Sequence, residues 1–152
     1  MLIRSGTARR ETGDGVCGPF TASLLSDTGD LTQFGAFIET LPPGSASSIL
    51  HWHSAEDEMV HLLTGTVTLV EGATETTMHP GDTACFKAGT AVGHCLRNDG
   101  AAEASYLVIG TRSGDDTVTY PLTGDTVTIH DGRKTYRDAN GTVTKTAPYH
   151  GA

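Results

Sequence analysis

Short stretches of alternating hydrophobic and polar residues run along most of this chain, with turn-forming residues between them. In residues 66–70 (TVTLV), Val67 and Leu69 alternate with threonines, which is the period of two expected for a strand. The same kind of pattern predicts about eight short strands, at residues 31–41, 47–53, 58–65, 66–72, 74–78, 83–87, 93–98 and 105–111. Proline and glycine favour turns between them, as at residues 42–44, 79–82 and 88–90.

The spacing of these stretches predicts the fold class. Many short strands joined by turns at near-regular intervals are typical of an all-β sandwich or barrel, and the jelly roll is one such fold. A length of 152 residues suits one domain, and 19 glycines fit many turns better than long helices. Periodicity alone does not separate these all-β options.

The two ends of the chain differ from this central part. Residues 1–15 are polar and Gly-rich, which predicts an arm or a frayed end, and residues 16–30 fit either one helical turn or an extended arm. After Arg112, further strands are expected at residues 117–121, 126–129, 133–137 and 142–146, with a hairpin turn at Asn140-Gly141. The organisation predicted is an N-terminal arm (1–30), a central β domain (31–112) and a C-terminal β extension (113–152).

Candidate chemistry is concentrated between residues 51 and 94. His51 and His53 are two residues apart, so on a strand both imidazoles point to the same face. Glu58 can add a carboxylate from the next strand, with Glu56 as a reserve candidate, and His94 offers a third imidazole further along. Such a donor set suits a divalent ion of the Zn, Fe, Mn, Ni or Cu group.

These residues resemble the two sequence motifs of the cupin superfamily. Gly44, His51, His53, Glu58 and Gly65 follow the first motif, with one extra residue between Gly44 and His51. The second motif corresponds to Gly81, residues 87–89, His94 and Asn98. Lys87 stands where proline is usual, and four residues instead of two separate Gly89 from His94. The resemblance covers roughly residues 31–112.

The resemblance selects a fold and a site. It implies a double-stranded β-helix, or jelly-roll barrel, with His51, His53, Glu58 and His94 as metal ligands inside it. Glu58 or a metal-bound hydroxide is then the candidate catalytic base. Phe86, Lys87 and Asn98 are candidate pocket residues, although in the family the asparagine at the place of Asn98 is more often structural. Lys87 could anchor an anionic substrate at the barrel mouth.

Two classes of function follow from the resemblance. One is a metal-dependent enzyme acting on a small oxygen-rich molecule, either a dioxygenase or an isomerase of sugars or sugar phosphates. A sugar-phosphate isomerase needs a phosphate clamp, and near the motifs only Lys87 and Arg97 are basic. The alternative is a non-catalytic module that binds or senses a small sugar-like ligand. The chain has a suitable residue at each of the four ligand positions, which favours a metal-dependent enzyme over a binding module.

Charge and composition restrict the partners. The formal net charge of −8 argues against nucleic acid and anionic membrane surfaces, both of which attract basic patches. No stretch is long and apolar enough for a membrane helix, the N-terminus lacks a secretory pattern, and three cysteines read as reduced thiols. We expect a cytoplasmic protein. We also expect a homodimer, because open sheet edges invite pairing and small cupins commonly exchange terminal strands.

Overall fold

The computed structural model describes residues 1–149, which contain fourteen strands and one short helix. The strands are β1 (Arg9–Gly15), β2 (Gly18–Leu24), β3 (Phe34–Leu41), β4 (Trp52–His53), β5 (Glu58–Thr64), β6 (Val67–Glu71), β7 (Thr74–Met78), β8 (Thr83–Phe86), β9 (His94–Arg97), β10 (Ala104–Thr111), β11 (Asp116–Tyr120), β12 (Asp125–His130), β13 (Arg133–Arg137) and β14 (Val143–Pro148). The helix, α1, is Leu25–Thr28. The last three residues of the predicted extension lie outside the described residues.

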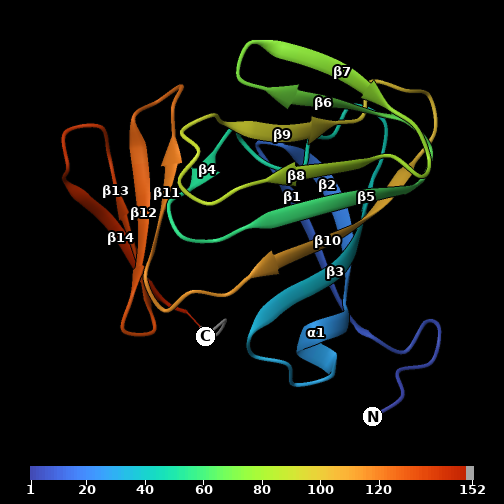
Figure 1. Ribbon diagram of the computed structural model, residues 1–152, viewed down its shortest axis with the longest axis horizontal. Helices are drawn as coiled ribbons and strands as arrows, with labels where there is room; N and C mark the ends of the chain where they lie inside the picture. Colours follow the sequence, from blue (N-terminus) through green and yellow to red (C-terminus); the bar gives the residue numbers. More distant parts are fainter. Residues whose placement is uncertain (150–152) are drawn as a thin grey trace.

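The strands form three antiparallel sheets (Figure 1). The largest has the order β1-β2-β3-β10-β5-β8, a second has the order β7-β6-β9, and the third has the order β14-β13-β12-β11-β4. The first two sheets enclose a common core, which confirms the prediction of an all-β barrel. In Figure 1 the third sheet stands to one side of this barrel as a separate wing.

Alternate residues of the barrel strands supply the core. On β5, Val60 and Leu62 are buried, and on the neighbouring β10 the buried positions are Ala104, Tyr106 and Val108. Val67, Met78 and Leu96 from the three-stranded sheet pack against this layer, together with Leu41 of β3. Apolar burial of this kind contributes roughly 1.5–3 kcal/mol for each fully buried aliphatic side chain, so it is the main force closing the barrel.

The turn after β5 requires glycine at position 65. Its φ of 75° lies in the left-handed region, which strains residues with a side chain. A Cβ at this position would also lie 2.6 Å from the carbonyl oxygen of Glu103, in the segment before β10. The motif glycine therefore allows the β5–β6 turn to lie against the start of β10.

The wing is built from the C-terminal extension, but it joins the barrel through β4. Strand β11 pairs with the two-residue strand β4, placing Val118 opposite His53 and Thr119 opposite Trp52. The alternating runs predicted after Arg112 are strands, and β13 and β14 form the hairpin expected around Asn140-Gly141. One of the candidate metal ligands thus lies on the strand that connects the two bodies.

Two local expectations were wrong. Residues 1–15 are not a free arm: β1 and β2 form a hairpin in full register from Arg9–Leu24 to Gly15–Gly18, and β2 extends the large sheet beside β3. Residues 47–53 are not one strand, because only residues 52–53 form β4. His51 instead makes an isolated bridge to His94. The homodimer and the domain boundaries stay predictions.

No helix within residues 1–149 is long and apolar enough to cross a membrane.

Asn98, expected in the pocket, is instead a structural residue of the core. It is completely buried, its Nδ2 donates to the carbonyl oxygens of Leu41 and Ala102, and its Oδ1 accepts from the Gly100 backbone N–H. These bonds tie the segment after β9 to the end of β3. The motif asparagine therefore fixes the β9–β10 connection and does not contact the cavity described below.

We expect Asn98→Ala to lower the free energy of unfolding by about 2–4 kcal/mol, because it leaves buried backbone groups without partners. Urea denaturation followed by circular dichroism measures the change. Asn140→Ala, in the exposed β13–β14 turn, is the matched control and should cost less than about 1 kcal/mol. Equal losses in the two variants would contradict the structural role of Asn98.

Candidate metal site

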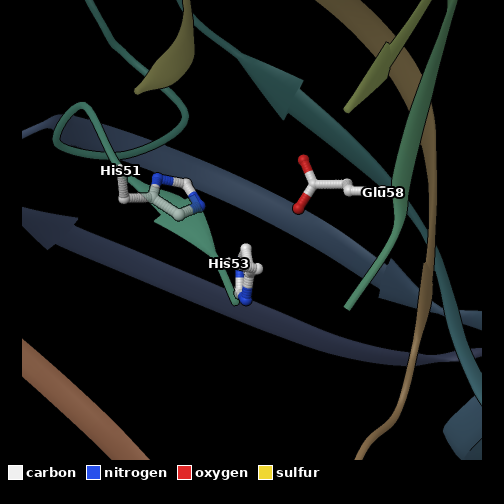
Figure 2. Close-up of side chains that lie close together, drawn as sticks. All are labelled: His51, His53 and Glu58. Atoms are coloured by element: carbon white, nitrogen blue, oxygen red, sulfur yellow. The ribbon is translucent and has the colours of Figure 1, made fainter. Parts of the chain in front are cut away.

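Three side chains from two adjacent segments face one another at one end of the barrel. His51 and His53 flank Trp52 at β4, and Glu58 is the first residue of β5. Figure 2 shows the Glu58 carboxylate directed at the two imidazole rings. One ligand atom from each of the three residues lies within 4.8 Å of the others. The residues that the sequence predicted as ligands are therefore brought together by the fold.

His94 of β9 lies next to this group of three. Its backbone exchanges two hydrogen bonds with His51, so the two residues lie opposite each other, and their ring centroids are 4.9 Å apart. His94 Nε2 lies 3.7 Å from Glu58 Oε1 and has no hydrogen-bond partner among the described residues, although it is buried. Phe86 stacks on the other face of this imidazole, with 3.6 Å between centroids, and holds the ring in place.

An unpartnered buried nitrogen is costly, since burying a polar group without a hydrogen bond loses its hydration. His94 Nε2 lies beside the Glu58 carboxylate. A cation between these two groups would accept the lone pair of the nitrogen and remove this penalty. The orphaned nitrogen is therefore an observation of this structure that fits a bound metal ion.

The other two imidazoles are each held by their Nδ1 atom. His51 Nδ1 lies 2.9 Å from the carbonyl oxygen of Ile49, and His53 Nδ1 lies 2.7 Å from Asp116 Oδ2. Both acceptors favour the tautomer with hydrogen on Nδ1, which leaves Nε2 as the free lone pair. A ligand histidine held from behind in this way is typical of protein metal sites.

Asp116, the first residue of β11, was missed by the sequence argument. It is buried, and its Oδ1 also accepts hydrogen bonds from the Ser54 hydroxyl and the Ala55 backbone N–H. Glu56, the reserve ligand candidate, lies on this outer side of His53, 3.7 Å from Nδ1, and accepts from the Ser113 N–H. No motif spacing links residue 116 to residue 53, so only the fold reveals this contact.

The electrostatics of the site favour a cation between the imidazoles and the carboxylate. Burial raises the pKa of Glu58, but the three histidines outweigh it, and the pKa lies below its usual value, so Glu58 is ionised. Burial lowers the pKa of His51, which keeps this imidazole neutral. Burial also acts to lower the pKa of His53, but the bond to Asp116 outweighs it and raises that pKa.

A cavity of about 180 Å³ extends from these ligands into the barrel. His51, Glu58 and His94 lie on its wall, and Phe86 lines it too, as the sequence predicted for a pocket residue. Lys87 does not line it. Its side chain is exposed and borders two neighbouring hollows, one of which has His53 and His94 on its wall. Asn98 is likewise not part of the wall.

Two further polar residues of the wall, Glu39 of β3 and Tyr106 of β10, were not predicted. The sequence around Glu39 (AFIETL) reads only as a strand, and its inward orientation depends on the strand register. Four donors at one end and a mixed polar and apolar wall make a site that can hold a divalent ion and a small oxygen-rich molecule.

Comparisons with known proteins agree with this fold. Residues 37–110 match the family model described as a cupin domain. A sugar phosphate isomerase from a cupin superfamily, from Silicibacter pomeroyi, is 34% identical over 83% of this chain and 80% of that chain, with a TM-score of 0.78. No curated protein matches the chain significantly.

Two other solved structures have similar folds. A putative sugar phosphate isomerase from Acidithiobacillus ferrooxidans is 26% identical over 93% of this chain and 94% of that chain, with a TM-score of 0.83. A predicted oxalate decarboxylase from Thermotoga maritima is 21% identical over 74% of this chain and all of that chain, with a TM-score of 0.64. At that identity, the second likeness concerns the fold alone.

We expect His53→Ala to abolish stoichiometric metal binding and Asp116→Ala to weaken it about 10–100-fold, because Asp116 orients the His53 ligand from behind. Isothermal titration of the metal-free protein with Zn²⁺ or Mn²⁺ measures both effects. Asp115→Ala is the matched control, since this neighbouring carboxylate is exposed and pairs with His130. Wild-type affinity in Asp116→Ala would contradict the role assigned to Asp116.

Proposed function

The chain belongs to the cupin superfamily, and on that premise we propose that it is a metal-dependent isomerase of a small sugar or sugar phosphate. The proposal rests above all on the convergence of His51, His53, Glu58 and His94 at the end of a small cavity. Such a site positions two vicinal oxygens of a substrate, as an aldose–ketose interconversion requires.

The donor set supports a Lewis-acid role. Three imidazoles and one carboxylate would leave positions free for substrate on an ion that takes five or six ligands. A structural zinc ion differs, because it takes only four ligands and all of them come from the protein. A divalent ion held there supplies positive charge that polarises a substrate carbonyl. The protein fixes the donors: Asp116 orients His53, the Ile49 carbonyl orients His51, and Phe86 holds the ring of His94.

The size and lining of the cavity support a small substrate. Its volume of about 180 Å³ slightly exceeds the roughly 150 Å³ cavity that admits benzene in another protein. Ser47 and Ser48 offer hydroxyl groups on its wall, while Val60, Leu96 and Val108 are apolar. This mixture suits a short carbon chain with several oxygens. None of the described residues lining the cavity is lysine or arginine.

A phosphate group would therefore sit at the mouth and not inside. A neighbouring hollow shares Phe37, Glu58 and Val108 with the cavity and is bordered by Arg112 and Lys134. Arg112 is engaged by Asp27 and by the carbonyl of Leu31, whereas Lys134 lies 5.0 Å from the ring centroid of Tyr149. Lys134 is thus the better cation for an incoming anionic group.

The two basic residues considered from the sequence lie elsewhere. Arg97 is held by Asp99 and Glu75 on the outside of the barrel. Lys87 borders a second hollow, with His53 and His94 on its wall, and stays a candidate anchor there. The relative from Silicibacter pomeroyi, which carries the name sugar phosphate isomerase, favours isomerase over dioxygenase chemistry. A non-catalytic sugar-binding module is the remaining alternative.

We expect the metal-loaded protein to interconvert aldose and ketose forms within a panel of three- to six-carbon sugars and their phosphates. Proton NMR under air and under nitrogen measures turnover, with chelator-treated protein as the control. Equal rates in both atmospheres support the isomerase. Turnover that needs oxygen would instead establish the dioxygenase alternative, and binding without turnover by metal-loaded protein would establish the sensing module.

We expect Lys134→Ala to raise KM for a sugar phosphate roughly 10- to 150-fold, because a charge-assisted bond to phosphate contributes about 1.5–3 kcal/mol. KM for the unphosphorylated sugar should not change. Lys145→Ala is the matched control, since Lys145 makes a similar contact with the ring of Tyr136, 5.3 Å from its centroid, and does not border the mouth. A KM that rises equally for both substrates would exclude a phosphate contact at Lys134.

A further inference from the structure

A carboxyl group and a phenol lie in the same cavity as the metal ligands. Glu39 of β3 and Tyr106 of β10 are direct partners across the sheet, and the Tyr106 hydroxyl donates a hydrogen bond to the Glu39 carboxylate. Glu39 is 9% exposed and Tyr106 is 1% exposed. No lysine or arginine is among the described residues of the cavity wall, and Tyr106 is the hydrogen-bond partner that the structure gives to this carboxylate.

Fold stability alone does not explain an acidic residue at position 39. Its inward-facing neighbours on β3 are Phe37 and Leu41, and the register partner of Phe37 on β10 is Val108. Burying a carboxylate among such residues costs free energy, and apolar residues of similar size usually stabilise such a position better. A buried acid kept beside a ligand cavity indicates a chemical role.

Burial is the largest influence on Glu39, and it raises the pKa of this carboxyl to about 7. The hydrogen bond from Tyr106 opposes this rise, and the charges of Glu58 and Glu11 add to it. The ionisable groups around Glu39 come from the neighbouring elements: Tyr106 of β10, Glu58 of β5, Glu11 of β1 and Cys17 of the β1–β2 turn. Near neutral pH, both forms are populated, as an acid–base catalyst requires.

The register places Glu39 deeper in the barrel than the metal ligands. Along β10, Glu39 pairs with Tyr106, whereas Glu58 pairs with Gly110 at the open end. The metal ligands and Glu39 therefore face the cavity from different depths. A substrate whose oxygens lie at the ligand end would turn its adjacent carbon atoms toward Glu39.

Building on the proposed isomerase function, we propose that Glu39 is the acid–base catalyst that moves the proton between the two reacting carbons, with Tyr106 as its positioning residue. The Glu39 carboxylate removes the proton from the hydroxyl-bearing carbon beside the carbonyl. The C–H electron pair becomes a C=C bond, and the C=O electron pair moves onto the carbonyl oxygen, which gives an enediolate.

The second half of the step restores a carbonyl. Glu39, now a carboxylic acid, returns its proton to the neighbouring carbon. The hydroxyl proton passes to the negatively charged oxygen as the new C=O bond forms. One proton has moved between carbons and one between oxygens. Substrate and product are isomers, so no oxidant or reductant takes part.

The test compares Glu39→Gln, Tyr106→Phe and wild type on an aldose or ketose that the wild type isomerises. We expect Glu39→Gln to lower kcat at least 100-fold, the scale of general acid–base catalysis, without loss of bound metal. It should also stop deuterium from D2O entering the substrate carbons, measured by NMR. Glu103→Gln, an exposed carboxylate before β10, is the control and should keep wild-type kcat.

Tyr106→Phe removes the bond that lowers the pKa of Glu39, so the acid limb of the kcat/KM profile should shift to higher pH. A merely structural tyrosine would lower activity without moving this limb. If the wild type is active and Glu39→Gln is equally active, the role proposed for Glu39 is wrong, while the proposed isomerase function stands. A metal-loaded wild type that isomerises no sugar would overturn the proposed function, and this proposal with it.

A second measurement needs no activity or metal. Because burial raises the pKa of Glu39 from 4.5 to about 7, the folded state holds this proton more tightly than the unfolded state, and stability is lost as pH rises through that range. The melting temperature of wild type relative to Glu39→Gln should therefore fall between pH 5 and pH 8. A constant difference would overturn the proposal by showing an ordinary carboxyl.

Discussion

The hydrogen bond between His53 and Asp116 joins the two bodies of this molecule. His53 belongs to β4, and Asp116 opens β11, the strand that pairs with β4 from the wing. The same carboxylate accepts from Ser54 and Ala55, so it also fixes the path of the chain after β4. Without this contact, a two-residue strand would have little to hold its imidazole at a fixed angle. The C-terminal sheet therefore supports the site, although it lies outside the barrel core.

The features that sequence predicted well are those with a strong local pattern. Alternation of Val67 and Leu69 identified β6, and proline and glycine marked the turns around it. The His-x-His pair predicted that two imidazoles lie together, because residues two apart on an extended chain share a face. This geometry is nearly independent of the rest of the fold. His94 was found through its motif, and its backbone pairing with His51 explains why so distant a residue reaches the same point.

The features that sequence missed depend on register between distant strands. Strand β1 is mostly exposed and polar, so it has no hydrophobic period, and its partner β2 holds it in place. Glu39 becomes a buried acid only because β3 lies against β10 in one register, and a shift of one residue would turn it outward. Asn98 was a pocket candidate because it lies four residues after His94, on the same face of an extended strand. Strand β9 ends at Arg97, and the Asn98 side chain instead bonds to the Leu41 and Ala102 carbonyls in the core.

The separation of His53 and Asp116 along the chain also affects how the protein is made. These residues are 63 positions apart, with all of the barrel strands from β5 to β10 between them. During synthesis the ribosome releases His51, His53 and Glu58 long before the carboxylate that orients His53. The orientation of the His53 imidazole therefore depends on a strand that is synthesised only after all of the barrel strands.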